Sequence, residues 1–365
     1  MNFKNLQDNF KIRYKTESDV SCVFCGTPLY ILGGIAKECE TSGILTTLSA
    51  GTAAAIDTDY KKNTFSLQEC RQNTIFTCSS AGLGTYSEDN YAAPLFRTLY
   101  RLISKLRLPL SGADILFANN AADKMFYNEK AALLCFAALS CGKKEEILKF
   151  IFPDDFFCND ALELATALTL TPGHCIVGKN CDSEYKKYIF PVSGKKIIII
   201  KTDIKNRRLP TLADAAYKNF CKNNPEISSP SQLSAENIAS DNSLKDLDKK
   251  LLTFLMNEEI RISKYEKASS FTDIAELINS SAYEFSKIVS DSDLFVLLEI
   301  LEKDTPALTF RPLKDNSSVY CIVDDENTDE LITKCEKEYE KKAGYKPTFY
   351  ICDTAASGIA RGIIH

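Results

Sequence analysis

The segment from Gly112 to Leu134 constrains this chain more than any other, because it has the frame of a phosphate-binding strand, loop and helix. Residues 113–118 predict a strand, and residues 128–139 predict an apolar helix. The join between them, Asp123–Lys130, is bulky and contains no glycine. Loops that cradle phosphate need glycine, because backbone N–H groups must approach the anion without a Cβ in the way. This loop therefore cannot bind phosphate in the usual manner.

Length and composition are those of a globular protein with room for two domains. The chain has 365 residues, of which 45% are hydrophobic and 25% charged, and its net charge is −5. The negative charge argues against nucleic acid or an anionic membrane as a partner. Apolar runs such as Ile197–Ile200 are far too short to cross a bilayer. We therefore expect no nucleic acid and no membrane as a partner.

The 14 cysteines do not indicate disulfides or a metal site. The residues from Met1 to Asp8 lack the apolar stretch of a secretion signal, so we expect a reducing, cytoplasmic location. Many of the cysteines lie in apolar settings, where they behave as small buried hydrophobic residues. Cys22 and Cys25 form a lone CxxC pair, and the two histidines are His174 and His365. We expect no metal site.

The chain mixes strand and helix signals in the manner of an α+β protein. Strands are predicted at residues 19–25, 74–78, 113–118, 174–177, 185–192, 195–202, 307–310, 318–323 and 348–352. Helices are predicted at residues 91–106, 128–139, 158–170, 213–222 and 329–342, and residues 244–303 are nearly all helical. Residues 223–243 are rich in Ser, Asn and Pro and predict a surface loop. The isoleucine run within residues 195–202 favours a buried strand.

Two segments resemble motifs of the galactokinase family, which belongs to the GHMP small-molecule kinases. Phe24–Cys39 follows that family's first motif without a gap and keeps Gly33 and Gly34. The segment that begins at Gly112 follows the family's phosphate-binding motif, also without a gap. The residues it keeps are Gly112, Asp114, Ala131 and Ala132.

Further segments resemble the family in the same order along the chain. They are residues 158–163, 255–264, 274–294 and 344–353, so that the resemblance runs from about Asp19 to Gly362. It implies an α+β, two-lobed GHMP kinase fold. The expected lobes are a ribosomal-protein-like N-terminal lobe at residues 1–192 and a ferredoxin-like C-terminal lobe at residues 193–365.

The sugar-binding positions of the family are mostly apolar in this chain. The resemblance places the substrate pocket at Leu29, Ile31, Ala36 and Glu38, where active members carry arginine, glutamate, histidine and aspartate. Only Glu38 keeps a carboxylate. A sugar's hydroxyl groups would lack bonding partners, and an unpaired polar group costs about 1–3 kcal/mol on burial.

The phosphate-binding positions have changed as well. The resemblance places them at Lys124, Tyr127, Asn128 and Lys130, in place of glycines and serines. A lysine can bind phosphate as a point charge, but lysines in a polar lead-in to a helix are more often solvated, and we favour that interpretation. The family's third motif, a glycine-rich turn, falls on Arg311–Ser318, which has no glycine and gains a proline.

The family's catalytic aspartate falls on Leu162, which cannot accept a proton from a sugar hydroxyl. Two neighbouring acids are weak substitutes. Asp160 lies about 200° around a helix from Leu162, so it should face away from the site. Glu163 lies about 100° around and would reach the site only if the helix rotated or began elsewhere. Both acids also suit the first turn of a helix, where negative charge favours the macrodipole.

Two hypotheses remain. The first is a pseudoenzyme without a cofactor, which has a binding, regulatory or scaffolding role and a possible protein partner. The second is an active kinase of a sugar or another small molecule, with Mg-ATP and a site rebuilt from Glu38, Glu163 and Lys124. A sensor of sugar and ATP is an intermediate case, weakened by the loss of the sugar-binding groups. We favour the first, because phosphoryl transfer depends on positioned groups, and here they are missing together.

Overall fold

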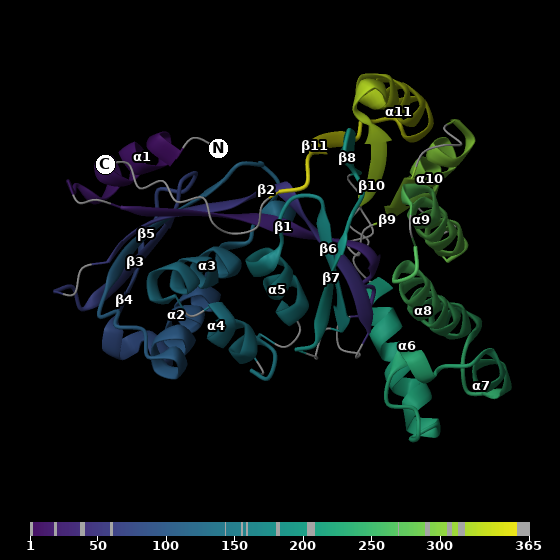
Figure 1. The fold of residues 1–365 in the computed structure, drawn as a ribbon, viewed down its shortest axis with the longest axis horizontal. Helices are drawn as coiled ribbons and strands as arrows, with labels where there is room; N and C mark the ends of the chain where they lie inside the picture. Colours follow the sequence, from purple (N-terminus) through teal and green to yellow (C-terminus); the bar gives the residue numbers. More distant parts are fainter. Residues whose placement is uncertain are drawn as a thin grey trace.

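The computed structural model of the chain contains two β-sheets, each flanked by helices (Figure 1). It describes residues 3–17, 20–36, 41–58, 61–142, 144–154, 156–157, 160–179, 183–202, 209–268, 270–288, 293–304, 309–312 and 318–355. Among these residues, no helix is long and apolar enough to cross a membrane.

The first sheet has seven strands in the order β4-β3-β5-β2-β6-β7, with β1 paired to β2. The strands are β1 (Ser21–Gly33), β2 (Ser42–Thr58), β3 (Thr64–Glu69), β4 (Phe76–Ser79), β5 (Ala113–Asn119), β6 (His174–Lys179) and β7 (Tyr185–Ile189). β1 and β2 form a long antiparallel hairpin, from the pair Ser21 and Ile56 to the pair Gly33 and Gly43. At Gly51 the hairpin requires glycine, because a Cβ there would lie 2.1 Å from the carbonyl oxygen of Cys25.

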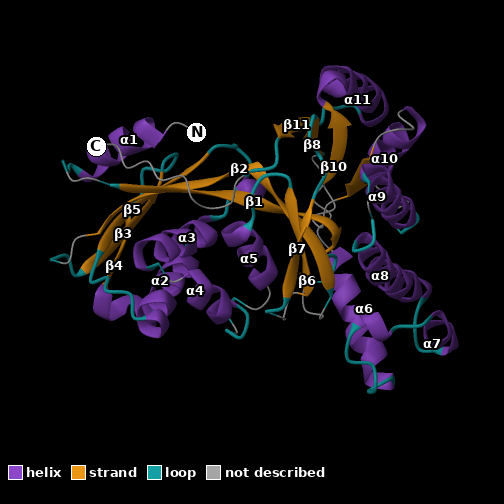
Figure 2. Ribbon diagram, viewed as in Figure 1, coloured by secondary structure: helices purple, strands orange, loops and turns teal. Residues whose placement is uncertain are grey.

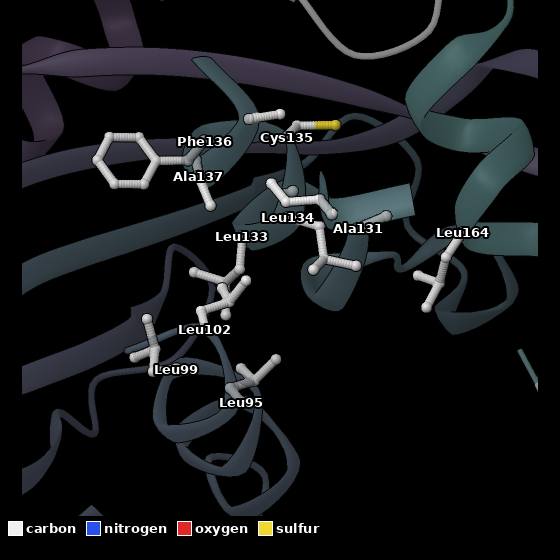
Figure 3. Packing of buried hydrophobic residues seen from close by; sticks show 14 of the residues in the cluster. Leu95, Leu99, Leu102, Ala131, Leu133, Leu134, Cys135, Phe136, Ala137 and Leu164 are labelled. Carbon is white, nitrogen blue, oxygen red and sulfur yellow. The ribbon is translucent and has the colours of Figure 1, made fainter. Parts of the chain in front are cut away.

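Helices cover both faces of this sheet (Figure 2). One face packs against α2 (Ala93–Leu106), α3 (Glu129–Cys141), α4 (Lys144–Ile151) and α5 (Ala161–Thr169). Leu95, Leu99 and Leu102 of α2 lie against the leucines of α3 in this core (Figure 3). The opposite face packs against α1 (Phe3–Tyr14), through Leu6 and Phe10.

The second sheet has four strands in the order β11-β8-β10-β9. The strands are β8 (Lys195–Lys201), β9 (Thr309–Pro312), β10 (Ser318–Asp324) and β11 (Thr348–Cys352). Its helices are α6 (Leu209–Asn223), α7 (Ala235–Ser240), α8 (Asp246–Tyr265), α9 (Phe271–Ser286), α10 (Asp293–Asp304) and α11 (Thr328–Ala343).

The isoleucine run is the central strand β8, as its sequence predicts. Ile198 and Ile200 pack against the helices of the second sheet. Ile197 and Ile199 pack on the other face, in a cluster that includes Leu29 and Ile31 of β1. All four isoleucines are buried, because β8 is covered on both faces.

Several sequence predictions need correction. The strand predicted to end at Cys25 continues to Gly33, and β2, β3, α1 and α4 lie in segments without a prediction. β2 was not predicted because its Gly, Ala and Thr residues show no clear alternation of polar and apolar side chains, although the strand is buried along most of its length. The segment predicted as a loop at 223–243 contains α7, which begins with a side-chain cap from Ser234. The predicted strand at 307–310 begins at Thr309, with residues 307 and 308 outside the described residues.

Candidate functional site

The predicted base position lies in a largely apolar cluster. Leu162, in the first turn of α5, is fully buried and packs with Tyr30, Leu45 and Ile176. It also lies so close to β6 that a Cβ at Gly178 would be 3.0 Å from Leu162 Cδ1. The side chain of Leu162 itself cannot accept a proton, and no carboxylate or histidine belongs to this cluster among the described residues.

The predicted substrate positions do not converge on one pocket. Leu29 and Ile31 of β1 are 4% and 0% exposed and belong to the cluster under β8. Ala36, also 0% exposed, belongs instead to the helical core of the second sheet. Glu38 lies outside the described residues. The three described positions therefore serve as core.

Helix α8 holds both ends of the β1–β2 connection. The backbone N–H of Gly33 donates to Glu258 Oε2 at 2.7 Å. The backbone N–H and the hydroxyl of Ser42 each donate to Glu259 at 2.7 Å. Arg261 in turn donates to Glu258 Oε1 at 2.8 Å. The resemblance at residues 255–264 covers this part of α8 but does not indicate these contacts.

The predicted phosphate loop is a short 3-10 turn, Lys124–Phe126. Asp123 caps it by accepting from the N–H of Met125 at 3.0 Å, and its other carboxylate oxygen contacts the ammonium of Lys201 in β8. Burial acts to raise the pKa of Asp123, but the Lys201 ammonium and the Met125 N–H hold that pKa below its usual range. Phe126 is fully buried, and Lys124 is exposed, as the prediction of a solvated lysine requires.

The N-terminus of α3 carries an internal anion. Glu129, in the first turn, is 9% exposed and accepts a hydrogen bond from the hydroxyl of Tyr91 at 3.1 Å. Burial raises the pKa of the Glu129 carboxyl. Just before it, the N–H of Asn128 donates to Thr52 Oγ1 at 2.8 Å. A helix N-terminus favours negative charge, and here a side chain of the same chain supplies it.

A cavity of about 320 Å³ joins most of the remaining predicted positions. It is lined by Tyr91, Pro94, Leu95, Tyr127, Asn128, Glu129, Lys130, Asp160, Glu163 and Leu164. Lys130 Nζ lies 3.3 Å from Asp160 Oδ2 and 5.0 Å from the ring centre of Phe156. Lys130 is therefore paired with Asp160, while 29% of its side chain remains exposed to solvent.

The orientation of Asp160 also corrects the sequence analysis. Asp160 precedes the first residue of α5 and has non-helical dihedral angles, φ −116° and ψ 3°. A helical wheel therefore does not place its side chain, and Asp160 lines the same cavity as Glu163. Leu162, between them in sequence, points into the apolar cluster instead. Cys158 and Asn159, which begin the predicted helix, lie outside the described residues.

A second cavity, of about 1080 Å³, lies between the β6–β7 hairpin, α4 and α8. Its lining includes Ser42, Gly178, Lys179 and Glu259. Burial raises the pKa of Glu259, while its bonds from Ser42 act in the opposite direction. None of the predicted site residues that the structure describes lines this cavity. Across the described ranges, no group of three or more His, Cys, Asp or Glu residues is arranged to hold a metal ion.

No protein-family model matches this sequence, and no curated protein matches it. Solved structures do match. The galactokinase of Lactococcus lactis, in complex with galactose, has a TM-score of 0.82 at 13% identity, over 97% of this chain and 98% of that one. The mevalonate kinase of Methanococcus jannaschii has a TM-score of 0.64 at 10% identity, over 93% and 99%. The fold is that of the GHMP kinases.

A putative sugar kinase from Campylobacter jejuni adds a third match, with a TM-score of 0.54 at 9% identity, over 95% of this chain and 99% of that one. At these identities the likeness extends to the GHMP kinase fold alone. Within that fold, the described substrate positions and the base position are divided among three apolar clusters.

Proposed function

We propose that this chain is a galactokinase-like protein that does not transfer phosphate and has a binding, regulatory or scaffolding role. The observation that carries the proposal is the complete burial of Leu162 at the base position, among Tyr30, Leu45 and Ile176. A kinase base must reach a substrate hydroxyl, either directly or through one water. An apolar side chain packed on all sides does neither.

The residues around the predicted phosphate-binding positions, at the N-terminus of α3, support the same proposal. Phosphoryl transfer requires cationic or N–H groups aimed at the transferred phosphate. In this chain, Glu129 brings a carboxylate to the N-terminus of α3, and the ammonium of Lys130 lies beside Asp160. Repulsion between carboxylates and a triphosphate opposes binding of Mg-ATP at this end. The proposed function requires no cofactor.

The two-lobe organisation belongs to this proposal too. The first sheet ends with β7 at Ile189 and the second begins with β8 at Lys195, so a boundary at residue 192 lies between the sheets. In the proposal, the two lobes are residues 1–192 and 193–365. Their surfaces bind a partner molecule, and no substrate is converted.

One observation favours the alternative of an active kinase with a rebuilt site. Asp160 and Glu163 line one cavity with Tyr127, Asn128 and Lys130, so two carboxylates lie beside the predicted phosphate positions. If Glu163 acts as the base, a hydroxylated substrate and Mg-ATP must share this cavity.

Transfer of labelled phosphate from Mg-ATP separates the two functions. The purified protein is incubated with galactose, and then with a panel of sugars, polyols and hydroxy acids. We expect no transfer above the rate of a reaction without protein. Turnover that is lost in Glu163→Ala and kept in Glu146→Ala, a change at an exposed residue of α4, would establish the alternative.

A further inference from the structure

The walls of the 320 Å³ cavity suit the hydrocarbon part of a small ligand. Pro94 and Leu95 of α2 form one side, and Leu164 of α5 forms another. Figure 3 shows Leu95 and Leu164 on either side of the first turns of α3. Tyr91 and Tyr127 add aromatic rings to the lining. This volume lies within the range of small-molecule pockets, which combine apolar walls with a few polar groups.

The charged groups that line the cavity are mostly anionic. Its lining contains the carboxylates of Glu129, Asp160 and Glu163, against the single ammonium group of Lys130. That ammonium is already committed to Asp160 at 3.3 Å. Carboxylates next to aromatic faces attract organic cations, through charge and through the ring quadrupole. Anions are repelled by the same groups.

A second, independent feature lies next to this cavity. Glu69, at the end of β3, is 2% exposed, and its Oε1 has no hydrogen-bond partner among the described residues. Its Oε2 accepts from the N–H of Arg71 at 2.8 Å. The negative charge of Glu69 acts on both Tyr91 and Glu129, which line the cavity. Glu69 therefore adds negative potential at two residues of the lining, which favours a cationic ligand.

We propose that this cavity binds a small organic amine, with its ammonium group between Glu129 and Glu163 and its stem against Tyr91, Pro94 and Leu95. The ammonium offers three N–H donors, enough for both carboxylates and for a third acceptor. This inference rests on the proposed function, because the 320 Å³ cavity cannot hold the phosphates of a nucleotide and an amine at the same time.

Binding of an amine is linked to the protonation of Glu129. Burial raises the pKa of this carboxyl, and Glu69 adds to the effect. The other charged or titratable groups around it are Tyr91, Arg71, Lys130, Asp160 and Glu163. An ammonium group beside Glu129 lowers its pKa again, so the amine should bind more weakly when Glu129 is protonated.

Titration calorimetry of the full-length protein with 1,4-diaminobutane at pH 6 tests the proposal. We expect saturable binding at millimolar concentration, and none with 1,4-butanediol, which has a similar length and no charge. Glu163→Gln should weaken binding by about tenfold or more, the scale of one lost charge-assisted contact. The matched control is Glu146→Gln, which alters an exposed residue of α4 and should leave the affinity unchanged.

The pH dependence of binding gives a second readout that does not depend on a variant. The affinity for 1,4-diaminobutane should fall as the pH is lowered from 7 to 4.5, because the raised pKa of Glu129 lies above its ordinary value of 4.5 and the carboxyl then takes up a proton. An affinity that does not fall, absence of saturation, or unchanged affinity in Glu163→Gln would each overturn the proposal. Phosphate transfer from Mg-ATP, by contrast, overturns the proposed function itself. A protein with neither amine binding nor transfer loses only this inference.

Discussion

Phe126 packs edge-on against Tyr350, with ring centres 4.9 Å apart, and thereby joins the predicted phosphate loop to β11 of the second sheet. The hydroxyl of Thr27 donates to the carbonyl of Phe126 at 2.8 Å, so β1 holds the same turn. In a loop that cradles phosphate, the backbone N–H groups remain available to the anion. Here the turn is instead part of the protein core.

The first prediction concerns this turn. Phe126→Ala should lower the free energy of unfolding by about 3–5 kcal/mol, because it removes a fully buried ring and leaves a cavity. Lys124→Ala, two residues earlier at an exposed position, should change it by less than about 0.5 kcal/mol. Urea unfolding followed by circular dichroism measures both. Equal effects of the two substitutions would show that the turn is not integrated in the core.

The second prediction concerns the contact between α8 and the β1–β2 connection. Glu258 is 3% exposed, accepts from Gly33 and pairs with Arg261. Glu258→Ala should cost about 3 kcal/mol, the lower end of the range for a broken buried pair, because Arg261 keeps its contact with Glu284. Glu258→Gln should cost less, since the amide oxygen still accepts from Gly33. A larger loss for Gln than for Ala in urea unfolding would refute this assignment.

The third prediction concerns pH. Burial raises the pKa values of Glu129 and Glu259 above the unfolded value of about 4.3. Their contribution to stability is therefore fully present below that unfolded value and is lost as pH rises through the folded values. Glu129→Gln and Glu259→Gln should each flatten the fall in stability as the pH rises above about 4.3, measured by urea unfolding at several pH values. An unchanged slope in both variants would contradict the raised pKa values.

The fourth prediction concerns acid unfolding. The pKa of Asp123 is held down by Lys201 and the Met125 N–H despite burial. Its contribution is present above the unfolded value of about 3.9 and is lost as pH falls through the lower folded value. Asp123→Asn should remove this loss and leave stability at pH 4 to 7 lower by a nearly constant amount. A variant that matches the parent at pH 7 would show that the Asp123 contacts contribute nothing.

The fifth prediction tests whether the base position can be restored. Leu162→Asp should yield no phosphate transfer and should destabilise the protein by about 4 kcal/mol or more, because it places a charge in an apolar cluster. Leu162→Asn introduces a side chain with nearly the shape of aspartate but without its charge, so it should lower the free energy of unfolding by less at pH 7. The stabilities of the two variants should become equal on acidification, as the aspartate becomes neutral. Galactose-dependent phosphate transfer by Leu162→Asp would contradict this prediction, because the substrate-binding and ATP-binding groups would then still be in place and only the base would be missing.

The sequence predicted the GHMP kinase fold well where elements have strong periodicity, as in α2, or a uniform apolar run, as in β8. It failed for β2, because a strand buried on both faces and built from Gly, Ala and Thr lacks an alternating pattern. It also missed α1, whose first turn carries no acidic residue.

The environment of the candidate site residues was harder to predict than the fold. Matching Leu162, Leu29 and Ile31 to polar family positions identified residues that the structure places in the core. The carboxylate at the start of α3 was overlooked, because Glu129 looks like an ordinary first-turn acid in the sequence. Its burial depends on Tyr91, 38 residues away, and on the end of β5, which only the folded chain brings together.

Thermal unfolding of the purified protein with and without Mg-ATP tests the central claim most directly. A ligand at one hundred times its Kd adds about 2.7 kcal/mol to the free energy of unfolding, which raises Tm by a few degrees for a chain of this size. The account predicts no shift in Tm at millimolar Mg-ATP, with or without galactose. A clear rise in Tm that Glu163→Gln abolishes would contradict it, because the cavity at α3 would then hold a nucleotide.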